Sequence, residues 1–143
     1  MRSIASLYRY AEKQNITVDR FPLPETGSLS LMTEDGDCYI AMDDSPAMRG
    51  AVERVHLAHE LGHCETGSFY SRWTMVDCIQ RHENRADKWA VKKLITESQL
   101  DAAVADGHTE LWDLAEYFGV TPAFMRKTVC WYTHGNLAAE LYF

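Results

Sequence analysis

Within the stretch HLAHELGH, residues 56–63, the segment HELGH holds two histidines and a glutamate at a spacing that could bind a metal ion. His59 and His63 are four residues apart, so on an α-helix both imidazoles lie on one face, one turn from each other. Two imidazole nitrogens can then meet one zinc ion at about 2.0–2.1 Å. Glu60 is rotated by about 100° from His59, where it can reach a metal-bound water without being a ligand. This HExxH pattern indicates a zinc site with Glu60 as general base.

The plain alternative is a pair of solvated or core histidines in an amphipathic helix, because short motifs also arise by chance. The context favours the metal site. The segment has helical periodicity, and Gly62 removes a side chain between the two predicted ligands. A glycine there allows another segment of the chain to approach closely.

A catalytic zinc needs a third protein ligand and an open position. The best candidate is Glu83 in HENRADKWAVKKL, where Asp87 follows four residues later on the same helix face. Two antiparallel helices could present His59, His63 and Glu83 to one ion. Asp87 could accept the outer N–H of a ligating histidine, as carboxylates behind metal ligands do. The alternative is that both carboxylates pair only with nearby basic residues, which are Arg81, Arg85 and Lys88.

Three other residues compete for the third position: His56, His82 and Cys64. His56 lies partly on the face of His59, but three histidines on one straight helix span two turns, too far to surround one ion. His82 points about 100° away from its neighbour Glu83 and could instead line a substrate cleft. Cys64 faces away from the predicted site. An ordinary structural role is the favoured interpretation for each of the three.

The elements before this site are predicted to be one helix and a small sheet. Residues 2–14 have apolar side chains at helical spacing, and residues 16–21 look extended. The β-rich runs at 28–32 and 38–43 are joined by a segment with Asp35-Gly36, which predicts an antiparallel hairpin. The second run, CYIAMD, could be an edge strand that an extended peptide joins; an ordinary hairpin strand packed on the helix is equally consistent.

The HExxH segment is predicted to lie on one long helix. Ser45 is a candidate N-cap with Pro46 at the first helical position, and the helix should run to about Glu65 with Gly67 just beyond it. After an aromatic-rich loop, a second long helix covers roughly residues 79–95. Strands first and helices afterwards give an α+β fold, mostly helical, with the small N-terminal antiparallel sheet packed on the HExxH helix.

The C-terminal third is predicted to form short helices. The first of these helices has Thr96 or Ser98 as its candidate N-cap and ends at Gly107. A helical hairpin follows at about residues 109–134. Its capping and stop residues are Thr109, Gly119, Thr121, Pro122 and Gly135.

This hairpin also has the form of a helix-turn-helix, with Arg126 and Lys127 on its second helix. A DNA-binding regulator is therefore the alternative function. Acidic residues on the first helix and few polar base-reading side chains on the second argue against it. The chain carries a net charge of −7, which repels phosphate backbones. Direct nucleic-acid binding is thus not expected.

Composition is that of an ordinary globular protein, with 143 residues, 46% hydrophobic and 24% charged. We expect a single domain over residues 1–143, no membrane span and no apolar signal core, hence a cytoplasmic protein. The four cysteines form no CxxC pair, so free and mostly buried thiols are the simplest expectation.

At HLAHELGH and then ENRADKWA, the chain resembles the ImmA/IrrE family of zinc metallopeptidases of phages, mobile elements and bacterial genomes. The likeness extends to YIAMDD before the motif and to LAEYFGVTPAFMRK near the end. The resemblance implies a zincin-like fold of the gluzincin type, one zinc ion on His59, His63 and Glu83, and Glu60 as general base. It further implies cleavage of a helix-turn-helix repressor protein, which releases silenced genes. The residue that stabilises the transition state is left open, with Tyr70 and His82 as candidates. A metal-binding protein that binds a repressor without cleaving it is a further alternative.

Overall fold

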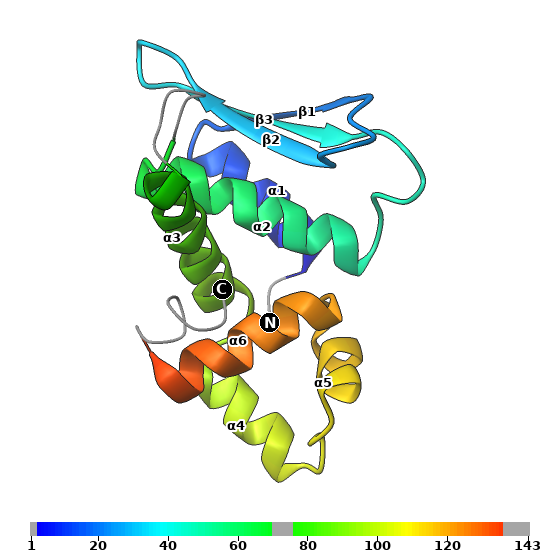
Figure 1. Cartoon of the computed structure of the whole chain (residues 1–143). Coiled ribbons are helices and arrows are strands. Elements are labelled where there is room, and N and C mark those ends of the chain that lie inside the picture. Colours follow the sequence, from blue (N-terminus) through cyan, green and yellow to red (C-terminus); the bar gives the residue numbers. More distant parts are fainter. Residues whose placement is uncertain (1–2, 70–75, 136–143) are drawn as a thin grey trace.

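The computed structural model describes residues 3–69 and 76–135. It is a mixed α+β fold in which a small sheet and its flanking helices form one end and short helices form the other (Figure 1). The elements in chain order are α1 (Ile4–Lys13), β1 (Thr17–Phe21), β2 (Ser28–Met32), β3 (Cys38–Asp43), α2 (Ala51–Thr66), α3 (Val76–Leu94), α4 (Glu97–Ala105), α5 (Leu111–Phe118) and α6 (Pro122–His134).

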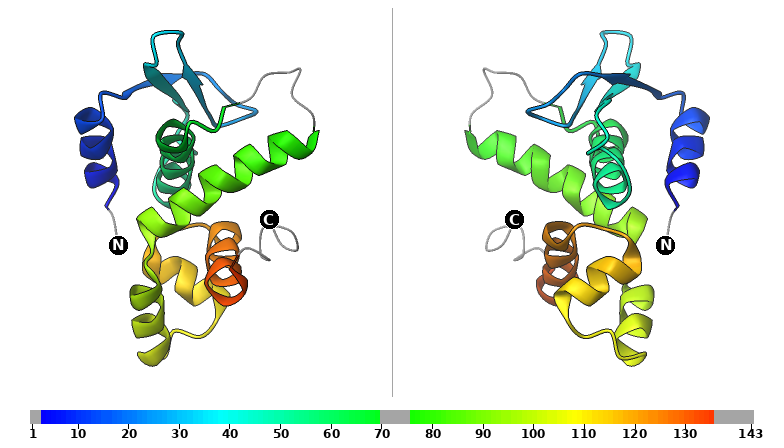
Figure 2. Two further views of the ribbon diagram at one scale, coloured as in Figure 1. Left: turned by 90° about the vertical axis from the view of Figure 1, so that its left-hand side faces the viewer. Right: turned by 90° about the vertical axis from the view of Figure 1, so that its right-hand side faces the viewer.

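Helix α2, which carries the HExxH motif, lies in the middle of the upper part of the molecule. It contacts β2 and β3 on one side, and α1 and α3 on others. Figure 2 shows the sheet above α2, with α1 beside it and α3 crossing it on the way to α4, α5 and α6. Most sides of α2 are therefore covered, and Leu57, Ala58 and Leu61 are fully buried. No helix of the described part is long and apolar enough to span a membrane.

The sheet has three strands in the order β1-β3-β2. The predicted hairpin is confirmed, since β2 and β3 pair antiparallel with Ser28 opposite Met42. The expectation of a wholly antiparallel sheet is wrong, because β1 pairs with β3 in parallel. The proposal of 38–43 as an edge strand is also wrong: β3 lies between its two neighbours, which fits its buried Ile40 and Met42. The edge next to α2 is β2.

Helix α2 begins later than the sequence suggests. The predicted cap at Ser45 with Pro46 following it is wrong: the helix starts at Ala51, after Gly50 with φ 65°. The Ser45 hydroxyl instead donates to the Asp43 carboxylate at 2.5 Å, so it is engaged at the end of β3. The predicted stop is confirmed, because Gly67 lies just beyond the helix in the left-handed region with φ 65°.

Gly62 allows α2 and α3 to pack closely. A Cβ atom at this position would lie 2.5 Å from the Ala86 carbonyl oxygen and 3.0 Å from its Cα. Any side chain there would therefore push the two helices apart, as the sequence predicts for a glycine between the histidines. Ala86 itself is fully buried.

The expectation that all four cysteines are free is wrong for two of them. Cys38 at the start of β3 and Cys64 near the end of α2 form a disulfide, with their Cα atoms 5.9 Å apart. Cys78 and Cys130 are thiols. The disulfide ties the C-terminal half of α2 to the sheet, so the sulfur of Cys64 is not available as a thiolate ligand for the predicted metal site.

The C-terminal helices follow the predicted caps with one exception. Thr96 forms a capping box with Gln99, and Thr121 caps α6 through the Phe124 N–H. Thr109 is not the cap of α5, whose N-cap is Glu110 without a side-chain hydrogen bond. Gly119 ends α5 with φ 66°, as predicted.

Arg54 joins this C-terminal part to α2. Its guanidinium donates to the carbonyl oxygens of Phe118 and Gly119 at 2.6 and 2.8 Å, and the side chain is buried. A cation at the C-terminal end of a helix is also favoured by the helix dipole. The short helices are thereby held against the helix that carries the motif.

Candidate metal centre

Three side chains from two helices converge on one point. The Nε2 atoms of His59 and His63 are 3.2 Å apart. Glu83 from α3 places Oε2 at 2.8 Å from His59 Nε2 and Oε1 at 3.4 Å from His63 Nε2. All three ligand atoms lie within 4.8 Å of one another, which is the arrangement of a site that could hold a metal ion. The structure thus brings together the three residues that the sequence singles out.

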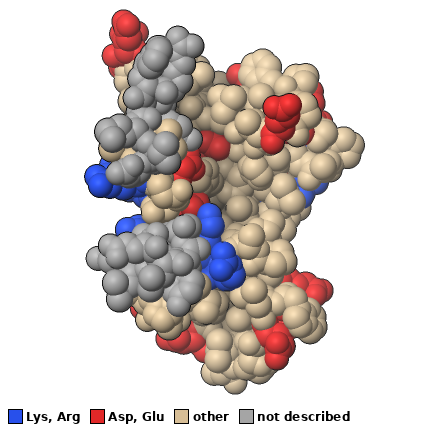
Figure 3. Space-filling view, viewed as in Figure 1, with Lys and Arg blue, Asp and Glu red and all other residues tan. Residues whose placement is uncertain are grey.

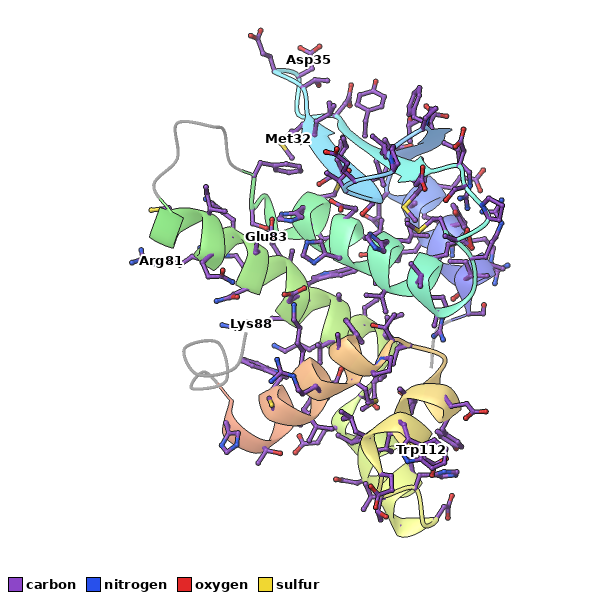
Figure 4. All side chains as sticks on the ribbon, turned by 45° about the vertical axis from the view of Figure 1, so that its right-hand side comes forward. Met32, Asp35, Arg81, Glu83, Lys88 and Trp112 are labelled. Atoms are coloured by element: carbon purple, nitrogen blue, oxygen red, sulfur yellow. A yellow bond between two sulfur atoms is a disulfide. The ribbon has the colours of Figure 1, made fainter. Side chains whose placement is uncertain are left out.

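The α2–α3 contact positions these side chains. Glu83 and Asp87 lie close to Ala86 on α3, which packs against Gly62, and both reach His59 on α2, at 2.8 and 2.7 Å. In Figure 4, Glu83 lies on the side of α3 that faces α2, whereas Arg81 and Lys88 point outwards. Arg81 is exposed. The alternative of carboxylates paired only with neighbouring surface cations does not describe the geometry.

The outer nitrogen of each histidine is held by an oxygen acceptor. His59 Nδ1 lies 2.7 Å from Asp87 Oδ1, and His63 Nδ1 lies 2.5 Å from the Ser68 carbonyl oxygen. With Nδ1–H donated outwards, each imidazole turns the lone pair of Nε2 towards the shared point. Sequence reasoning found the Asp87 contact but missed Ser68, which contributes a backbone carbonyl just after the Gly67 turn.

The donor set fits zinc. Tetrahedral ligands at bond lengths of about 2.0–2.2 Å stand about 3.3 Å from one another, and the three separations in the structure are 2.8, 3.2 and 3.4 Å. Two imidazoles and one carboxylate are a set that catalytic zinc sites use, and they leave a fourth position for water or substrate.

The carboxylates govern the charge of the site. Burial alone would lower the pKa of His59, but hydrogen bonds to Asp87 and Glu83 and their negative charges outweigh it and raise the pKa to about 10. Burial would raise the pKa of Asp87, yet His59 and Lys127 hold it below its usual value. Lys127, from α6, donates to Asp87 Oδ2 at 2.8 Å. The pocket therefore stabilises positive charge at His59, which a proton or a metal cation can supply.

Glu60 is buried beside the two histidines, with 6% of its surface exposed. Its Oε2 accepts a hydrogen bond of 2.7 Å from the hydroxyl of Ser28, the first residue of β2. The same hydroxyl lies 2.7 Å from Nδ1 of His56. Burial lowers the pKa of His56, which favours a neutral ring. His56 is thus next to the site without being among the three converging side chains.

A cavity of about 730 Å³ opens over these residues. Figure 3 shows this face of the molecule hollowed between its upper and lower parts. Residues of β2 border the cavity on one side, and residues of α6 border it on the other. The lining includes Ser28, Leu29, Ser30, Thr121, Phe124 and Lys127, together with the converging side chains.

Tyr70 and His82 are the two candidates for stabilisation of the transition state. Tyr70 lies outside the described residues. His82 is partly buried on α3 and is not part of the described lining of the cavity. The role in transition-state stabilisation stays a prediction for both residues.

The comparison with protein families agrees with this site. Residues 11–129 match the family model of the IrrE N-terminal-like domain, peptidase family M78. Because the match covers most of the chain, the protein belongs to this family, and membership supports a metallopeptidase of the ImmA/IrrE type that acts on a protein substrate. Among curated proteins and solved structures, none matches the chain.

Proposed function

We propose that the protein is a zinc-dependent endopeptidase. In this proposal His59, His63 and Glu83 hold one zinc ion, Asp87 orients His59, and Glu60 is the general base. The observation that carries the proposal is the convergence of two imidazole Nε2 atoms and one carboxylate within 4.8 Å, with the buried Glu60 on the same helix and in the same cavity. Family membership supports it independently.

Residues of the chain would have separate roles in hydrolysis: one moves the proton, and others orient the imidazole rings. When bound, zinc would supply Lewis acidity and lower the pKa of a water molecule from about 15.7 in bulk to about 7. Glu60 takes the proton of the attacking water and passes it to the leaving amine. Its burial beside the histidines keeps the carboxylate within reach of both positions. Asp87 and the Ser68 carbonyl hold the imidazole rings in one orientation throughout.

Strand β2 offers a place for the substrate. It is the edge of the sheet next to α2, and Ser28, Leu29 and Ser30 line the cavity. An extended peptide can add to such an edge through main-chain hydrogen bonds. Leu31 and Met32 of the same strand are exposed, 48% and 42%, and could contact apolar side chains of the peptide. We therefore propose β2 as the peptide-binding strand, in place of the 38–43 strand considered from the sequence.

The substrate we propose is a helix-turn-helix repressor of a phage or mobile element, whose cleavage releases the genes that it silences. Support comes from the resemblance of the HLAHELGH and ENRADKWA segments to ImmA/IrrE peptidases and from family membership. We place the enzyme in the cytoplasm, because that is where such a repressor acts.

The DNA-binding alternative is weakened by the position of α6. Phe124, Met125 and Thr128 of this helix are buried, and Lys127 is engaged with Asp87 at the metal site. A recognition helix needs its polar face free for a groove of DNA. A protein that binds a repressor without cleaving it remains the second candidate, and the presence of Glu60 in the cavity argues for the peptidase.

The test is incubation of the zinc-loaded protein with the repressor encoded nearby, followed by mass spectrometry of the products. We expect cleavage by the wild type and by the surface control Ser98→Ala, and a loss of at least about a hundredfold in Glu60→Gln, since general bases contribute about 10²–10⁴-fold. Both variants should retain one zinc ion per chain. If Glu60→Gln cleaves the repressor as fast as the wild type, Glu60 is not the general base. Repressor binding without cleavage by any variant would support the non-catalytic alternative.

A further inference from the structure

A chain of hydrogen bonds leads from the general base to a histidine that is not a metal ligand. Ser28 stands between them: its hydroxyl lies 2.7 Å from Glu60 Oε2 and 2.7 Å from His56 Nδ1. Ser28 is buried, 8% exposed, at the point where β2 begins above α2. The three residues come from two elements, and all three line the cavity.

The chemistry of the three groups fixes the direction of the chain. Glu60 acts as a base only as a carboxylate, and a carboxylate accepts hydrogen bonds without donating them. The Ser28 hydroxyl must therefore donate its single proton to Glu60. Its oxygen is then an acceptor, so His56 must donate from Nδ1–H. The burial that lowers the pKa of His56 is consistent with this neutral ring.

The backbone before β2 confines the His56 ring. Gly27 has φ 75°, and a Cβ atom there would lie 2.8 Å from His56 Cε1 and 3.3 Å from its Nε2. The ring is thus packed against a position that only glycine fills without displacing it. A side chain placed so tightly is suited to orient a neighbour.

We propose that Ser28 and His56 are positioning residues for the general base. They tie Oε2 of Glu60 in place, which leaves Oε1 as the atom that takes the proton from water. The inference rests on the proposed peptidase function, because Glu60 needs a fixed orientation only if it moves a proton. Neither residue is among the metal ligands, so their effect falls on catalysis and leaves metal binding intact.

The experiment compares Ser28→Ala with Ser28→Thr, which keeps the hydroxyl, and with the surface control Ser98→Ala. Zinc affinity is measured by chelator competition, folding by thermal unfolding, and hydrolysis by kcat and KM on a peptide that spans the cleavage site. For Ser28→Ala we expect kcat to fall by about tenfold to a hundredfold, as for a misplaced catalytic group, while KM and zinc affinity stay within about twofold. Ser28→Thr should restore most of kcat.

A second pair tests the histidine. His56→Asn can place an amide N–H near the position of Nδ1, whereas His56→Leu removes the donor. We expect kcat to be lowered more in His56→Leu than in His56→Asn, again at constant zinc affinity. Independently of activity, ¹⁵N spectra of the labelled histidines should show His56 with the proton on Nδ1, and this signal should shift in Ser28→Ala.

The outcomes separate the two claims. If the wild type cleaves while Ser28→Ala keeps the wild-type kcat, the positioning role is wrong and the peptidase stands. A fall in zinc affinity parallel to kcat would also overturn the inference, because it would show a structural effect on the metal site. If Glu60→Gln cleaves as well as the wild type, or if the wild type cleaves nothing, the proposed function fails and the positioning role fails with it.

Discussion

The contact between Gly62 and Ala86 predicts that a single methyl group added at Gly62 weakens zinc binding at the proposed metal centre. In Gly62→Ala, the added Cβ would lie 2.5 Å from the Ala86 carbonyl oxygen, where ordinary contact begins at 3.4 Å. Because packed interiors have little spare room, α2 and α3 must separate locally by about 0.9 Å. Zinc sites tolerate changes in ligand distance of only about 0.2 Å. Glu83 is on α3 and both histidines are on α2, so this separation acts directly on the ligand set.

The expected cost to folding is smaller than the cost to metal binding. Overpacking lowers the free energy of unfolding by about 1–3 kcal/mol. The higher helix propensity of alanine than of glycine raises it by about 1 kcal/mol. The metal-free protein should therefore lose about 0–2 kcal/mol of unfolding free energy. Zinc affinity should fall by about tenfold to a hundredfold, the range for displaced support of a ligand.

The assay for Gly62→Ala is zinc competition against a chromophoric chelator, with urea unfolding of the metal-free protein and Ser98→Ala as control. If the variant binds zinc within twofold of the wild type and gains about 1 kcal/mol of stability from helix propensity, the close α2–α3 approach does not set the site. The reasoning would then be refuted.

Three further perturbations follow from the same contacts. Asp87→Ala removes an acceptor from the metal site, so zinc affinity should fall about tenfold to a hundredfold; unchanged affinity by chelator competition would contradict its orienting role. Reduction of the Cys38–Cys64 disulfide, which spans 26 residues, should lower the unfolding free energy by up to about 3–4 kcal/mol, measured by urea unfolding with and without reductant. The hydrogen bond from Ser45 lowers the pKa of Asp43, so its stabilisation is present above the ordinary aspartate pKa and is lost as pH falls through the lowered value. Asp43→Asn should therefore show a weaker loss of stability below about pH 4; an unchanged pH profile would contradict this.

The convergence of the three side chains could be predicted from the sequence because it depends on local helical geometry. His59 and His63 share a helix face by spacing alone, and so do Glu83 and Asp87. The close approach of the two helices could be expected from Gly62. These parts of the site need only the period of an α-helix and one tertiary contact.

The rest of the site depends on contacts that no local pattern encodes. Ser28 reaches Glu60 only because β2 lies at the edge of the sheet above α2, and strand order is a tertiary property. The parallel pairing of β1 with β3 and the Cys38–Cys64 disulfide have the same origin. At Ser45, a local rule failed because a competing acceptor, Asp43, engages the hydroxyl that would have capped the helix.

The central claim is that His59, His63 and Glu83 hold one zinc ion. The most direct measurement is X-ray absorption at the zinc edge of the loaded protein, together with its zinc content. We predict one zinc per chain, two imidazole nitrogens at about 2.0–2.1 Å and the remaining scatterers as oxygen at about 2.0–2.2 Å. Replacement of Glu83 by alanine should remove one oxygen and lower the affinity. A sulfur scatterer near about 2.3 Å, or an unchanged spectrum and full zinc content in Glu83→Ala, would contradict the account.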